Sequence, residues 1–189
     1  MSGRVSGETR LFTYTFFHVG ARAALTSAEN GEEGQAYHLL NALILSSFLV
    51  EAYLNHLGEL RGYAQWNDKK DRTPVWNKYK LLRGKIGLQV SSIDESYPKV
   101  AAAINFRNEM AHGRTETHNF SVETEEMIWP HQQEFPVGWQ TSLTTANVRA
   151  CFDACRAMIY ELHKEAGLGA HPFSKMSSSQ MRFTAGMQG

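Results

Sequence analysis

The chain has 189 residues, enough for one domain of ordinary size with a hydrophobic core. Lysine plus arginine and aspartate plus glutamate both number 19, so the formal net charge is zero. The chain therefore lacks the overall basic excess with which proteins bind long nucleic acids through many phosphates. Any contact with nucleic acid has to be local.

Cysteine usage and hydropathy indicate a soluble intracellular protein. Cys151 and Cys155 lie four residues apart on one predicted helix, which favours reduced core cysteines over a disulfide or a metal site. The densest apolar run, residues 42–50, is shorter than the roughly 20 residues needed to span a bilayer, and we identify no export signal. We therefore expect a cytoplasmic protein with no membrane contact, no bound metal and no cofactor.

The first half of the chain is predicted to contain two long helices. After a short flexible leader at residues 1–8, apolar residues recur at spacings of three and four, which predicts an amphipathic helix over about 9–29. A second helix begins near Glu32 and runs to about Gly62. Its middle is apolar nearly all round, so it has to be covered on more than one side, by neighbouring helices or by a partner chain.

A thin line of polar residues runs through this second helix. Ser47, Glu51 and Asn55 follow one another at intervals of four and therefore share a face. Burial of a carboxylate without a partner is costly, and Arg107 is an attractive partner for Glu51 if the line is buried. The alternative is that the line faces water or a wet groove, and the pattern leaves both open.

The next segment is locally basic. Residues 69–85 contain seven basic residues and one acidic residue, a local net charge of +6, and the part from Val75 to Ile86 is predicted to be a short helix. Trp76 and Tyr79 are interleaved with the basic residues, a combination that suits single-stranded nucleic acid. The alternative is a solvated charged face with the aromatic side chains directed inward. The candidate RNA contacts of the chain are Lys78, Lys80, Arg83 and Arg114.

The second half completes a helical pattern. A helix follows Pro98, and a last helix is predicted over about 144–166. Between them, residues 116–136 contain five acidic and no basic residues, which predicts a long acidic loop or irregular hairpin insertion. Residues 167–189 are predicted to be a disordered tail. The fold class is therefore all-α: one antiparallel bundle of four to five helices over residues 9–166.

Residues 106–113, with the sequence FRNEMAHG, carry the strongest candidate for chemistry. They place Arg107, Asn108 and His112 within about one and a half helical turns. Arginine is a permanent cation whose planar fork suits phosphate oxygens, and histidine transfers protons near neutral pH. Together these side chains can cleave a phosphodiester without a metal ion, and they are the candidate catalytic residues.

The helical spacing leaves the geometry of this motif open. Asn108 and His112 share a face, whereas Arg107 and His112 differ by about 140° around the axis. Either the arginine side chain curls round the helix, or the helix ends at Gly113 and His112 turns toward Arg107 from the last turn. In the non-functional interpretation, Arg107 is a solvated helix residue and His112 simply caps the helix.

The motif and the long helix together resemble a known superfamily. Arg107-Asn108-x-x-x-His112 is similar to the R-x4–6-H motif of HEPN (higher eukaryotes and prokaryotes nucleotide-binding) domains, with the polar residue after the arginine that active members usually show. Residues 48–55, with the sequence FLVEAYLN, look like the long helix of that superfamily, with Glu51 and Asn55 at its polar positions. The resemblance covers roughly residues 9–166. Nucleotidyltransferase-silenced members often carry a tyrosine two residues after the histidine, where this chain has Arg114.

The resemblance implies a bundle that dimerises so that two motifs meet in a cleft, commonly as a metal-independent endoribonuclease used as a toxin or in antiviral defence. The partners it implies are RNA, a second copy of the chain, and an antitoxin or regulatory protein. His112 and Arg107 would act on the phosphodiester, Asn108 would orient the phosphate or the histidine, and Glu51 would support Arg107. The alternative function is a non-catalytic module that binds a nucleotide or RNA, or that holds the dimer together.

Overall fold

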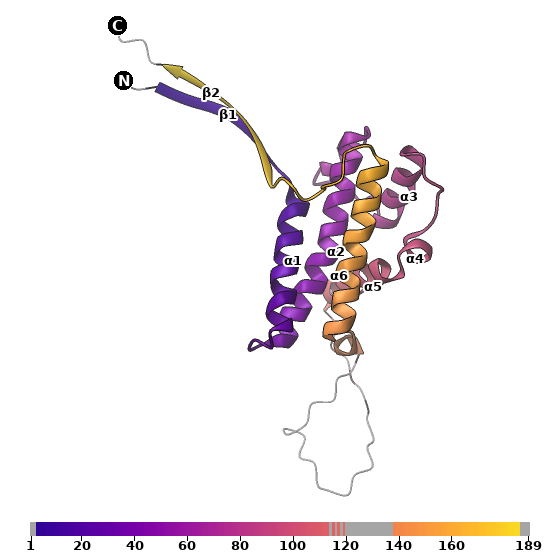
Figure 1. The fold of residues 1–189 in the computed structure, drawn as a ribbon. Coiled ribbons are helices and arrows are strands. Elements are labelled where there is room, and N and C mark those ends of the chain that lie inside the picture. The colour runs from indigo at the N-terminus through magenta and orange to yellow at the C-terminus, as the bar shows by residue number, and fades with distance from the viewer. Residues whose placement is uncertain (1–2, 114, 116, 118, 120–137, 186–189) are drawn as a thin grey trace, which may run out of the picture.

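The computed structural model describes residues 3–113, 115, 117, 119 and 138–185, and this part of the chain is mostly helical (Figure 1). About six helices pack as a bundle, and a small antiparallel sheet joins the two ends of the chain. The helices are α1 (Thr13–Glu29), α2 (Gln35–Leu60), α3 (Val75–Lys85), α4 (Ile93–Ser96), α5 (Pro98–His112) and α6 (Thr145–Glu165). Two short 3-10 turns are η1 (Ala64–Asn67) and η2 (Gly138–Ser142), and the strands are β1 (Gly3–Leu11) and β2 (Ser177–Ala185).

Helix α2 is the centre of the bundle. It contacts α1, α3, α5, α6 and η1, and Leu43, Val50 and Leu54 are among its fully buried residues. Neighbouring helices therefore cover the apolar helix on several sides, as its sequence predicts. By length and composition α2 is also the one helix in the described part of the chain that could cross a bilayer. A core helix of a soluble protein passes the same test, and half of the most apolar window of α2 is buried within the bundle.

Helices α5 and α6 follow their predicted limits closely. Pro98 occupies the first turn of α5, where its missing N–H costs nothing, and Gly113 ends the helix with a left-handed φ of 41°. The side chain of Thr144 accepts a hydrogen bond from the backbone of Asn147 at the start of α6. The apolar stripe of α6 is buried and includes both cysteines, which are free thiols.

The two ends of the chain differ from the prediction of a flexible leader and a disordered tail. Strands β1 and β2 pair antiparallel, in register from Gly3 opposite Ala185 to Leu11 opposite Ser177. Figure 1 shows this ribbon projecting away from the helices. Helix α1 consequently begins at Thr13 rather than near residue 9, and the prediction of an all-helical chain is wrong for the termini.

The segment before β2 is held on α1. The backbone N–H of Phe12 donates to the carbonyl of Met176 at 2.9 Å, and the hydroxyl of Tyr14 donates to the carbonyl of Pro172 at 3.1 Å. These bonds place the start of β2 beside the end of β1, which fixes the register of the ribbon. The predicted acidic insertion at 116–136 lies, except for residues 117 and 119, outside the described residues.

Candidate functional site

Of the two alternatives for the α2 polar line, the structure shows the one in which Glu51 pairs with Arg107. Arg107 Nη2 donates to Glu51 Oε2 at 2.8 Å, and Arg107 Nε lies 3.5 Å from Ser47 Oγ. The guanidinium carbon also lies 5.4 Å from the centre of the Phe48 ring. The packing of α5 against α2 brings these residues together, so three contacts from α2 fix the orientation of the arginine.

This ion pair lies at the edge of the core. The side chains of Arg107 and Glu51 are 21% and 33% exposed, whereas Ser47 is fully buried. Both interpretations of the polar line are therefore partly right: it is buried at Ser47 and reaches a groove at Glu51. Among the described residues, Arg107 Nη1 has no hydrogen-bond partner, so the oriented guanidinium keeps the two N–H donors of this nitrogen for a ligand oxygen.

Among the described residues, the other two residues of the motif do not join this cluster. Asn108 is half-buried, and His112 is exposed at the last position of α5, directly before the left-handed Gly113. No hydrogen bond or ring contact joins His112 to Arg107 or Asn108 in the described part of the chain. In the described part of the chain, α2 therefore orients the arginine, while His112 lies exposed at the end of α5.

Lys78 is an interior residue, and we withdraw it from the candidate RNA contacts. Its side chain is 2% exposed, its Nζ lies 2.6 Å from Asp71 Oδ2, and it donates to Asn55 Oδ1 at 2.8 Å. Nζ also lies 5.6 Å from the centre of the Trp66 ring. Desolvation raises the pKa of Asp71, but hydrogen bonds from Lys78 and Thr73 outweigh it and lower that pKa to about 2. The ammonium group thus binds Asn55, the last residue of the polar line on α2.

Arg83 is also an interior residue with protein partners, so it too is removed from the candidate RNA contacts. Its guanidinium is buried and donates to the Gln89 carbonyl at 2.8 Å, to the Tyr79 hydroxyl at 2.9 Å and to Glu161 at 3.4 Å. Tyr97 donates a further hydrogen bond of 2.5 Å to the same Glu161 oxygen. Burial and the neighbouring Glu161 carboxylate raise the pKa of Tyr97, so this hydroxyl stays protonated.

Two of the four candidate RNA contacts remain possible. Lys80 is exposed on α3, and Arg114 lies outside the described residues. The interleaved aromatic residues point inward, as the alternative interpretation of this segment holds: Tyr79 is fully buried and Trp76 packs against the core. The basic face of α3 is therefore smaller than the charge count indicates.

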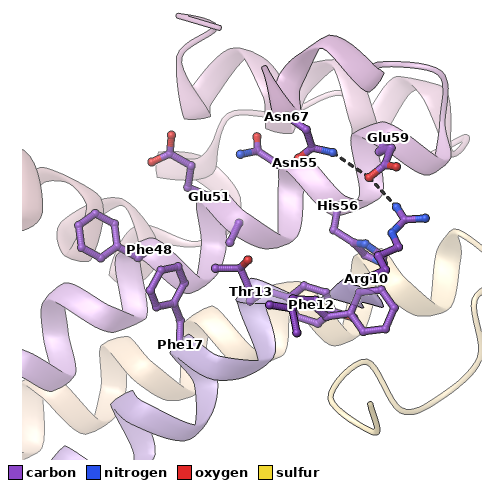
Figure 2. Close-up of a pocket in the computed structure, with 13 residues that line it drawn as sticks. Arg10, Phe12, Thr13, Phe17, Phe48, Glu51, Asn55, His56, Glu59 and Asn67 are labelled. Carbon is purple, nitrogen blue, oxygen red and sulfur yellow. Dashed lines mark hydrogen bonds and ion pairs between the residues drawn. The ribbon is translucent and has the colours of Figure 1, made fainter. Parts of the chain in front are cut away.

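A polar groove of about 450 Å³ lies next to the Arg107–Glu51 pair. Figure 2 shows Glu51, Asn55 and His56 from α2 around it, with Phe17 from α1 and Arg10 from β1. At one end Arg10 lies 2.6 Å from Glu59 Oε2, which also accepts a hydrogen bond of 2.7 Å from Asn67. Arg107, Asn108 and His112 are not among its lining residues.

His56 forms part of an aromatic cluster beside this groove. Its ring centre lies 5.3 Å from that of Phe12 and 4.9 Å from that of Tyr14. Burial lowers the pKa of His56, and the nearby Arg10 cation lowers it further, so the imidazole is neutral at pH 7. Within the described residues, no group of three or more His, Cys, Asp and Glu side chains is arranged to hold a metal ion.

Sequence reasoning missed the groove residues contributed by the N-terminal segment. The sequence pattern predicts Arg10, Phe12 and Thr13 at the start of a regular helix, whereas they form the transition from β1 to α1. Only Val5 and Leu11 are apolar side chains within residues 4–11, so the strict alternation of polar and apolar residues that signals a strand is absent there.

The chain matches no model of a known protein family, and no curated protein and no solved structure gives a significant match to it.

Proposed function

We propose that the protein is a metal-independent endoribonuclease of the HEPN type that acts as a toxin or an antiviral-defence effector. The observation that carries the proposal is the orientation of Arg107 by Glu51 and Ser47, five residues before an exposed His112 on the same helix. An arginine held in this way is prepared to stabilise negative charge on phosphate oxygens without reorganisation during the reaction.

The reaction uses the substrate's own 2′-hydroxyl as the nucleophile. One His112 accepts the proton of this hydroxyl as its oxygen attacks phosphorus, and a second His112 donates a proton to the departing 5′-oxygen. Arg107 stabilises the charge on the two non-bridging oxygens, and Asn108 orients the phosphate or the imidazole. The products are a 2′,3′-cyclic phosphate and a 5′-hydroxyl.

This assignment requires a homodimer. Cleavage calls for a base and an acid, and each chain supplies one histidine in the motif. A two-fold axis near the C-terminal end of α5 brings two such imidazoles and two oriented arginines into one cleft. The exposure of His112 in the single chain supports this arrangement, because the side chain is free to enter a shared cleft.

The second candidate is a non-catalytic binding or dimerisation module. The observation that favours it is the lack of contact between His112 and the Arg107 cluster within the described part of one chain. In this alternative Arg107 holds a nucleotide phosphate, or the motif only stabilises the dimer. An antitoxin or other regulatory protein is a partner under the first proposal and is not required under the second.

A cleavage assay on mixed RNA separates the two candidates. Purified protein is incubated with RNA in the presence of a chelator, next to the variants His112→Ala and Arg107→Ala. The matched control is His171→Ala, which removes an exposed histidine from the segment between α6 and β2. The nuclease proposal predicts fragments from the wild type and the control and none from the two motif variants. Intact RNA in every lane, or cleavage that needs added magnesium, would contradict it.

A further inference from the structure

In the groove beside Glu51, the side chains of Glu51 and Asn55 form a hydrogen-bonding floor, and the rings of Phe17 and Phe48 form aromatic walls. Glu51 and Asn55 lie one turn apart on α2, so their side chains are neighbours along one edge of the groove (Figure 2). The rings of Phe17 and Phe48 lie at one end with their centres 5.6 Å apart. The volume of about 450 Å³ falls within the usual range of small-molecule sites.

The internal contacts of the protein fix which atoms of Asn55 are available. Lys78 Nζ donates to Asn55 Oδ1 at 2.8 Å, and the buried Lys78 is itself held by Asp71. This hydrogen bond orients the amide with Oδ1 toward Lys78, and the Nδ2 group is the end left to face a ligand. Asn55 consequently presents hydrogen-bond donors to the groove.

Glu51 presents acceptors next to these donors. Its Oε2 accepts the hydrogen bond from Arg107, and Oε1 has no partner among the described residues. Each carboxylate oxygen can accept more than one hydrogen bond, so Glu51 can bind two adjacent donors while it keeps Arg107 in place. Along α2 the floor thus offers two acceptors followed by a donor.

This order matches one nucleobase. The Watson–Crick edge of guanine carries two adjacent donors, N2–H and N1–H, followed by the O6 acceptor. Cytosine presents the opposite order, uracil has one donor between two acceptors, and adenine has a single donor beside an acceptor. Recognition of unpaired bases typically combines hydrogen bonds to this edge with contact to aromatic side chains, which Phe17 and Phe48 supply here.

We infer that the groove binds a guanine base, with Glu51 accepting from N1–H and N2–H and Asn55 Nδ2 donating to O6. What the inference implies for cleavage rests on the proposed function. Because Glu51 lines the groove and also binds Arg107, the base belongs to the nucleotide whose phosphate Arg107 contacts. Cleavage then occurs on the 3′ side of guanosine in single-stranded RNA, where the guanosine's own 2′-hydroxyl is the nucleophile.

Calorimetry with mononucleotides tests the groove without any cleavage step. The full-length protein is titrated with guanosine, adenosine, cytidine and uridine monophosphates. Guanosine monophosphate should bind at least ten-fold more tightly than the other three, because each mismatched base leaves a hydrogen-bonding group of the floor unpaired. Inosine monophosphate, which lacks the N2 amine, should also bind about ten-fold more weakly, whereas 7-deazaguanosine monophosphate should bind as guanosine monophosphate does.

A matched pair of variants tests the donor. Asn55→Asp replaces the Nδ2 donor with an acceptor and keeps a partner for Lys78, so guanosine monophosphate should bind at least ten-fold more weakly. Asn77→Asp makes the same chemical change at an exposed position of α3 and should leave binding unchanged. The ligand comparison on the wild type decides the matter even if Asn55→Asp does not fold. Equal affinity for all four nucleotides, or no binding of any of them, would overturn the inference.

These outcomes are separable from the fate of the nuclease proposal. Guanine-selective binding by a protein that cleaves no RNA would support the groove and contradict the nuclease. Cleavage of RNA after all four nucleotides alike would support the nuclease and overturn the guanine site.

Discussion

Replacement of Lys78 with methionine decides whether this lysine belongs to the interior or to an RNA surface. Methionine keeps most of the side-chain volume and removes the ammonium group, which contacts Asp71 at 2.6 Å and Asn55 at 2.8 Å. The change leaves the Asp71 carboxylate, 11% exposed, without its cation. Removal of one partner from a buried ion pair costs about 3 to 5 kcal/mol.

The lower end of this range applies to Lys78→Met. Asp71 keeps hydrogen bonds from the backbone N–H and the hydroxyl of Thr73, at 3.2 and 2.7 Å, and it retains some contact with water. We expect the free energy of unfolding to fall by about 3 kcal/mol at pH 7. For a chain of this size that corresponds to a fall in Tm of about 6 to 12 °C.

Urea and thermal unfolding followed by circular dichroism measure the effect, with Lys80→Met as the matched control. Lys80 lies two residues further along α3 and is exposed, so its replacement should change the unfolding free energy by less than about 0.5 kcal/mol. The pKa of Asp71 is lowered to about 2, so its stabilisation is present above its ordinary value of 3.8 and is lost as the pH falls toward 2. Equal stability of the two variants at pH 7 would refute the interior placement of Lys78.

Three further predictions follow from the fold and the proposed dimer. Burial lowers the pKa of His18 to about 4, with Arg156 and Arg22 acting in the same direction, so the unfolded chain binds a proton that the folded protein does not. The free energy of unfolding should therefore fall by about 3 kcal/mol between pH 6.5 and pH 4. Thermal melts at several pH values should show a flatter dependence for His18→Phe, because the pKa values of His56 and His163 are lowered less. Reversal of the exposed Lys80 and Lys85 to glutamate should weaken RNA binding and reduce its salt dependence in filter-binding assays, and an unchanged salt slope would make α3 a merely solvated face. Light scattering should give about twice the chain mass of 21.3 kDa, with specific activity falling on dilution, and a fully active monomer would exclude the shared cleft.

The sequence predicts the helical bundle well because each helix buries one face, so its apolar residues recur with the period of a helix. The limits of α6 agree with the predicted ones to within a residue, and α5 ends at Gly113, as in one of the two alternatives that the motif left open. The Arg107–Glu51 pair was also predictable, because a carboxylate in an apolar helix needs a cation and the motif helix carries one.

The terminal ribbon was not predictable in the same way. Strands β1 and β2 are separated by most of the chain, and their register depends on the bundle placing Phe12 beside Met176. Each strand alone is largely polar, with no local turn to indicate its partner. A two-stranded ribbon is marginal in isolation, so its formation is a consequence of the packed helices rather than of local preference.

The error at Lys78 has a different origin. A count of charges treats Lys78 and Lys80 alike, whereas their positions on α3 differ. Lys78 lies three residues after Val75 and four before Leu82, both of them buried, so helical spacing puts it on the apolar face. The presence of Asp71 within reach of that face then converts a basic residue into part of the core.

Analysis of the RNA ends tests the central claim, that Arg107 and His112 cleave RNA through its 2′-hydroxyl, most directly. A 5′-labelled oligoribonucleotide is incubated in chelator with the wild type or with His112→Ala. In a third sample the wild type receives a copy of the oligonucleotide that carries 2′-deoxyguanosine in place of each guanosine. The account predicts fragments from the wild type that end in a 2′,3′-cyclic phosphate, with none from His112→Ala and none at the deoxy positions. Fragments with 3′-hydroxyl ends, or equal cleavage at the deoxy positions, would contradict it.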